Sequence, residues 1–167
     1  MWSSDRRSVI GGAIAGAGLL VLGGCFRPML AEDNDAREIR HRIALPPVDE
    51  RFEHYLVETL EDRLGEPQDP AFVLDVVSQV TEGGLAITQD DAVTRITLRV
   101  RAAWSLRRTG ETLPLIADVA FSQSGYNATT SLFATRQTRL EIERRLAQDI
   151  GGRIARAIFA RADELVA

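Results

Sequence analysis

The clearest pattern in the chain is a strict alternation of apolar and polar residues over residues 95–106. One face of this segment is apolar: Ile96, Leu98, Val100, Ala102, Trp104 and Leu106. The other face is mostly polar: Arg95, Thr97, Arg99, Arg101 and Ser105. Period two predicts a strand with one face on the core and the other facing water or a partner.

Three further segments predict strands around this one. Residues 71–80 are rich in Val, Leu and Phe, and Glu82-Gly83-Gly84 indicates a bend, bulge or turn near their end. Residues 107–111 predict a hairpin turn into a returning strand over residues 112–122. Earlier in the chain, residues 38–45 partly alternate and stop at a Pro-Pro pair, which predicts a shorter strand.

Two segments change to a helical period. The first follows Asp49, a potential cap, and ends before Gly65, with an apolar stripe of Phe52, Tyr55, Leu56, Leu60 and Leu64. The second covers roughly residues 132–164 and can be loosened by Gly151-Gly152. Its stripe recurs every fourth residue: Ile142, Leu146, Ile150, Ile154 and Ile158.

The order of these segments is therefore strand, helix, three strands, helix. Two amphipathic helices can cover one face of a four-stranded sheet. Because the first crossover contains a helix, the first strand can run parallel to its neighbour, whereas the later strands pair as hairpins. We expect an α+β fold, namely a two-layer sandwich with a mixed, mostly antiparallel four-stranded sheet.

The N-terminal residues have the layout of an export signal. Arg6-Arg7 precede an uncharged apolar run over residues 9–22, and Gly23-Gly24-Cys25 follow. The end of the run resembles the Leu-Gly/Ala-Gly/Ala-Cys lipobox of bacterial lipoproteins, which implies cleavage before Cys25 and acylation of that residue. We therefore expect a cleaved signal peptide over 1–24, a lipidated tether over 25–36 and one domain over 37–167.

Composition narrows the classes of function. The expected mature chain has 143 residues and a net charge of −5, a poor match for nonspecific binding of nucleic acid. Cys25 is the only cysteine, so an internal disulfide and a cysteine-based metal site are excluded. All 20 basic residues are arginines, whose planar guanidinium groups can bind phosphate or carboxylate through two hydrogen bonds.

Three segments together resemble the LPS-assembly lipoprotein LptE family, particularly its alphaproteobacterial branch. Residues 25–30, Cys-Phe-Arg-Pro-Met-Leu, are similar to the family's Cys-Gly-Phe-x-Pro-Leu start, and residues 99–106 are similar to its central strand. Residues 124–127, Ser-Gly-Tyr-Asn, precede Ser-Leu-Phe-Ala and a long Arg-rich helix, as in the family's Ser-Tyr-Asn and Ser-x-Tyr/Phe-Ala motifs. The chain departs from this pattern by lacking the Gly after Cys25 and by inserting Gly125.

The resemblance implies a lipid-anchored protein on the periplasmic face of the outer membrane. Such proteins form a plug in the β-barrel LptD, assist its assembly and bind lipopolysaccharide during insertion into the outer leaflet. An alternative from another class is an auxiliary periplasmic lipoprotein of an ABC-type lipid transporter.

For the chemistry of binding, we select Arg99, Arg101, Arg107 and Arg108 as the lipopolysaccharide-binding candidates, since they share a strand face and its hairpin tip. Guanidinium groups match the phosphates of the ligand. Two other roles would explain the same arginines. They can form ion pairs with nearby acidic residues on a solvated sheet face, or they can contact the wall of the barrel. No nucleophile–base set is evident around His41 or His54, so we expect neither an enzyme nor a cofactor or metal.

Overall fold

The computed structural model describes residues 35–84, 95–127 and 131–166. The predicted signal peptide, Cys25 and nearly all of the predicted tether lie outside the described residues. The elements follow in the order α2 (Asp35–Glu38), β1 (Ile43–Ala44), α3 (Arg51–Leu64), β2 (Phe72–Gly84), β3 (Ile96–Arg108), β4 (Pro114–Tyr126), α4 (Leu132–Phe159) and α5 (Ala162–Val166).

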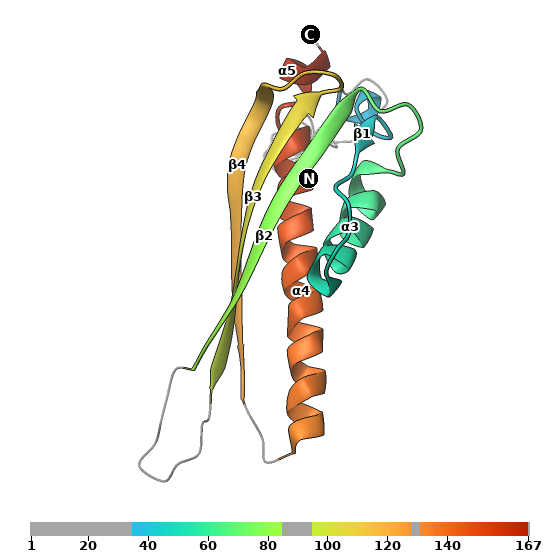
Figure 1. The fold of residues 1–167 in the computed structure, drawn as a ribbon. Helices are drawn as coiled ribbons and strands as arrows, with labels where there is room; N and C mark the ends of the chain where they lie inside the picture. Colours follow the sequence, from blue (N-terminus) through green and yellow to red (C-terminus); the bar gives the residue numbers. More distant parts are fainter. Residues whose placement is uncertain (1–34, 85–94, 128–130, 167) are drawn as a thin grey trace, which may run out of the picture. The chain divides into compact units, whose positions relative to one another are not determined.

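The four strands form one mixed sheet in the order β1-β2-β3-β4. β1 runs parallel to β2, with Ile43 opposite Phe72. β2 and β3 are antiparallel along their whole lengths, and β4 is antiparallel to β3. Helices α3 and α4 both lie on one side of the sheet (Figure 1). The predicted α+β fold and its order of elements are confirmed.

The core lies between this side of the sheet and the two helices. The apolar face of β3 is buried as its alternation predicts, and Leu98, Val100 and Leu106 are fully inaccessible. The helical stripes meet it from the other layer, because Leu56 and Leu60 of α3 and Ile150, Ile154 and Ile158 of α4 belong to the same cluster. Burial of these side chains is the main source of stability.

Helix α3 begins one residue later than Asp49 predicts. Glu50 is the N-cap residue. The Glu53 carboxylate accepts hydrogen bonds from the backbone N–H groups of Asp49 at 3.0 Å and Glu50 at 3.2 Å. At the other end Gly65 has a φ of 84°, and its N–H donates to the Glu61 carbonyl at 2.8 Å. Both ends therefore have partners for groups that the helix leaves free.

Three strand predictions are wrong in extent, including residues 112–122, where β4 instead covers Pro114–Tyr126. Residues 38–45 contribute only the two residues of β1, and residues 35–38 are helical. Glu82-Gly83-Gly84 does not bend away, since Gly83 pairs with Thr97 and Gly84 with Ile96 in β3. A long antiparallel partner satisfies the backbone groups of these residues and overrides the local preference of glycine for turns.

The glycine pair in α4 leaves the helix unbroken, because Leu132–Phe159 is one continuous element. Gly151 faces α3, where a Cβ atom would lie 3.0 Å from the Cβ and Cγ2 atoms of Thr59. The absence of a side chain at Gly151 thus lets the two helices approach closely. Packing between α3 and α4 offsets the low helix propensity of the pair.

Polar contacts also connect α4 to the sheet. The Ser122 hydroxyl of β4 donates to the Asp149 carboxylate at 2.7 Å, and Arg153 donates to the same oxygen at 2.9 Å. Partial burial raises the pKa of Asp149, but the hydrogen bonds from Ser122 and Arg153 outweigh it and hold that pKa below its ordinary value. Asp149 therefore stabilises the fold when it is ionised.

We expect the variant Asp149→Asn to lower the free energy of unfolding by about 1 kcal/mol at pH 7, the usual net value of a hydrogen bond. Because the folded-state pKa is lowered, this contribution is present above the ordinary value of 3.8 and is lost as the pH falls through the folded-state pKa. The difference from wild type should therefore shrink in acid, as measured by denaturant titration at several pH values.

Glu141→Gln is the matched control, since it removes an exposed pair with Arg145 on the same helix. Such pairs contribute about 0.3–0.5 kcal/mol. A difference for Asp149→Asn that is absent at pH 7, or that persists unchanged in acid, would contradict this account.

Candidate anion-binding site

The site lies on the side of the sheet that faces away from α3 and α4 (Figure 1). We call this side the open face; it carries the odd-numbered side chains of β2, β3 and β4. Among the described residues, no helix packs over it. Arg99 and Arg101 of β3 are exposed there, together with Val77, Val119 and Phe121 of the neighbouring strands.

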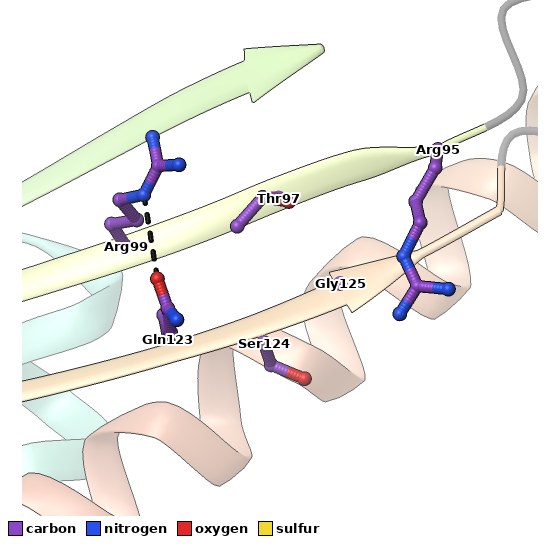
Figure 2. A pocket seen from close by; sticks show the side chains of 6 residues that line it. All are labelled: Arg95, Thr97, Arg99, Gln123, Ser124 and Gly125. Carbon is purple, nitrogen blue, oxygen red and sulfur yellow. Dashed lines mark hydrogen bonds between the residues drawn. The ribbon is translucent and has the colours of Figure 1, made fainter. Parts of the chain in front are cut away.

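A hollow of about 270 Å³ is present at the end of the open face away from the β3–β4 hairpin. It is lined by Arg95, Thr97, Arg99, Gln123, Ser124 and Gly125. Figure 2 shows Thr97 between the two arginines along β3, and Gln123 beside Arg99 on β4. The Arg99 Nε atom donates to the Gln123 Oε1 atom at 3.4 Å.

Small residues make room for the guanidinium groups. Gly83 of β2 and Gly125 of β4 both pair with Thr97, so this row of the sheet carries little side-chain bulk. A Cβ atom at Gly125 would lie 3.2 Å from the Arg95 Nε atom, and one at Gly83 would lie 3.6 Å from an Arg99 guanidinium nitrogen. Gly125 therefore leaves room for the Arg95 side chain beside β4.

The described residues that line the hollow carry a net positive charge. Neither Arg95 nor Arg99 forms an ion pair with any residue in the ranges that the structure describes. None of the six lining residues is acidic. Two guanidinium groups with amide and hydroxyl neighbours can bind a phosphate or another anion through charge-assisted hydrogen bonds.

The four arginines selected from the sequence do not form one cluster. Arg99 lines the hollow, and Arg101 follows it on the open face, opposite Phe121. Arg107 lies eight residues from Arg99, about 27 Å at the usual rise of a strand, and its Nε atom donates to Asp75 at 2.9 Å. Arg108 lies 5.7 Å from the ring centroid of Phe72, and Phe72 is a core residue. The length of β3 and the alternation of its side chains therefore separate Arg99 and Arg101 from Arg107 and Arg108.

Arg95 and Gln123 are functional candidates that the sequence alone did not select. Arg95 has the correct parity for the polar face, but Gln123 joins it only through the register that places it opposite Arg99.

Beneath this end of the sheet, the Tyr126 hydroxyl donates to Glu82 at 3.2 Å, and Arg139 of α4 donates to the same carboxylate at 3.0 Å. Burial, followed by the Glu82 charge, raises the pKa of Tyr126. These contacts hold the ends of β2, β4 and α4 together.

The two histidines are placed outside this site. The His41 Nδ1 atom lies 3.0 Å from the Glu66 carbonyl oxygen, and His54 is exposed beside Tyr55. Within the described part of the chain, no group of three or more His, Cys, Asp or Glu side chains is placed to hold a metal ion. None of the helices described is both long and apolar enough to cross a membrane.

The fold has counterparts among solved structures, although no protein-family model matches the sequence and no curated protein matches it. A Caulobacter crescentus CB15 protein described as a presumed lipoprotein has a TM-score of 0.63 at 15% identity, over 77% of this chain and 96% of that one. Rare lipoprotein B from Shewanella oneidensis has a TM-score of 0.59 at 13% identity, over 75% and 98%. A minor lipoprotein from Acinetobacter baumannii has a TM-score of 0.52 at 18% identity, over 71% and 89%. At these identities the likeness shows the fold alone.

We expect the double variant Arg95→Gln/Arg99→Gln to weaken binding of inorganic pyrophosphate about tenfold, because two charge-assisted contacts are lost. Titration followed by calorimetry or NMR measures this change. Arg107→Gln is the matched control, since Asp75 already compensates its charge. An equal loss in the control would assign binding to overall charge, or to the hairpin-end arginines, instead of to the hollow.

Proposed function

We propose that this chain is an outer-membrane lipoprotein of the LptE type, anchored through Cys25 on the periplasmic face. In this role it forms a complex with an LptD-type β-barrel, assists assembly of that barrel and binds lipopolysaccharide on its way to the outer leaflet. The proposal unites the lipobox-like N-terminus, the family-like segments at residues 25–30, 99–106 and 124–134, and a fold found in proteins that are named lipoproteins.

The observation that carries the proposal is the hollow with two guanidinium groups that have no ion-pair partner among the described residues. Lipopolysaccharide presents phosphates and sugar carboxylates beside acyl chains, and the planar groups of Arg95 and Arg99 suit such anions. The hollow is shallow and lies on the surface of a sheet. A large headgroup can therefore reach it without any movement of the core.

The proposed anchor fits a permanent role in a membrane complex. One acyl chain of myristoyl size gives only marginal, reversible attachment, whereas two or more give stable anchoring. Lipidation on the sulfur and the new amino terminus of Cys25 supplies several chains. A protein held in this way stays beside its partner and meets each ligand molecule in turn.

Depletion of the protein in its own bacterium tests the proposal. We expect less lipopolysaccharide at the cell surface and an immature barrel, measured by surface labelling and by the electrophoretic mobility of the barrel. The tagged wild-type protein should copurify with the barrel. Copurification with transporter subunits would instead support the ABC-type alternative, and normal surface lipid with a normal barrel would contradict the proposal.

Complementation with Arg95→Gln/Arg99→Gln separates the two parts of the proposed role. Both residues lie on the surface at one end of the sheet, so we expect the variant to fold, copurify with the barrel and support its maturation. Delivery of lipopolysaccharide should nevertheless fall. Full delivery by this variant would remove the hollow from the proposed mechanism while leaving the assembly role intact.

A further inference from the structure

An apolar band crosses the open face next to the arginine hollow. Val77 of β2, Ala103 of β3 and Val119 of β4 pair across the sheet in one row. Phe121 lies in the next row, opposite Arg101. Val77 is 74% exposed, Phe121 is 51% exposed and Val119 is 43% exposed. Large, exposed apolar side chains of β2 and β4 thus flank Ala103 on a surface that none of the described helices covers.

The band has a depression of its own. A hollow of about 210 Å³ is lined by Asp75, Val77, Ala103, Trp104 and Ser105. Ala103 and Ser105 are small and are flanked by Val77 and Asp75 of β2. The surface is therefore lower over β3 than over the neighbouring Val77, which suits a narrow apolar group lying along the strand.

Charged and apolar side chains occupy successive rows of the open face. Along β3, Arg99 and Arg101 lie nearest the hollow, the apolar row at Ala103 follows, and Ser105 and the ion-paired Arg107 lie beyond it. An amphiphile with an anionic headgroup and hydrocarbon chains has the same order of chemistry. The lumen of an outer-membrane barrel is usually polar, so the apolar band is a poor match for a barrel wall.

The spacing also suits an acyl chain. Four residues separate Arg99 from Ala103, which is about 13 Å along a strand. The hydrocarbon core of a bilayer is about 30 Å thick, so the chains of one leaflet extend roughly 15 Å. A chain that starts beside a phosphate at Arg99 therefore reaches the band and its depression.

We propose that the apolar band formed by Val77, Ala103, Val119 and Phe121 holds acyl chains of the anionic glycolipid whose phosphates bind at Arg95 and Arg99. The inference rests on the proposed function and assigns a second subsite to it. The open face then binds the two ends of one amphiphile, and the band shields part of its hydrocarbon from water.

The test compares two probes with the full-length lipidated protein in mild detergent. One probe is hexa-acylated, bisphosphorylated lipid A, and the other is its fully deacylated bisphosphorylated disaccharide. We expect the wild type to bind the acylated probe at least about tenfold more tightly, since only that probe buries hydrocarbon. Calorimetry measures both affinities.

The triple variant Val77→Thr/Val119→Thr/Phe121→Thr makes the band polar with residues that favour strands. We expect it to lose most of the preference for the acylated probe while binding the deacylated probe like the wild type. Val48→Thr is the control, because Val48 is exposed outside the sheet. Circular dichroism verifies that each variant is folded.

The possible failures are distinguishable. Equal affinity of the wild type for both probes, or a full preference in the folded triple variant, would overturn the acyl subsite and leave phosphate binding in place. Absence of binding by the wild type to either probe would overturn the lipopolysaccharide-binding part of the proposed function, and the acyl subsite with it. If the triple variant does not fold, a photocrosslinker in place of Phe121 must label the acylated probe, and one in place of Val48 must not.

Discussion

The structure depends on one packing constraint, namely that both large helices cover the same face of the sheet. Leu56 and Leu60 of α3 and the isoleucines of α4 pack on the even-numbered side chains of three strands of 13 residues each. Gly151 lets the helices approach closely enough to do so together. Because both of these helices pack on that face, neither covers the open face, which is accessible to water or a ligand.

This constraint explains why the candidate binding residues lie on the surface of the sheet. Antiparallel register brings residues distant in sequence into rows, so that Gly83, Thr97 and Gly125 form a low row beneath the guanidinium groups. Two rows further on, Arg101 lies opposite Phe121, where charged and apolar character meet. The Tyr126–Glu82–Arg139 contacts hold this end of the sheet to α4 and stabilise the surface on which the arginines lie.

The hydrophobic periodicity of the sequence is sufficient to predict which faces of the strands and helices are buried. The strand register, which the sequence does not show, determines which residues lie together on the surface. Alternation over residues 95–106 and the four-residue repeat from Ile142 report burial directly, so both predictions hold. Strand partners are not encoded locally, which is why the sequence predicts a bend, bulge or turn at Gly83-Gly84 and does not identify Gln123. Arg107 and Arg99 share a parity, but only the length of β3 and the position of Asp75 reveal that they serve different contacts.

The central claim is that the open face, and not the helical layer, receives the ligand. Methyl NMR spectra of the valine and leucine side chains, recorded during titration with lipid A, test it most directly. We predict that the signals of Val77 and Val119 shift, whereas those of Leu60 and Leu98 in the core stay in place. Saturable shifts confined to the helices or the core, with Val77 and Val119 unchanged, would contradict the account.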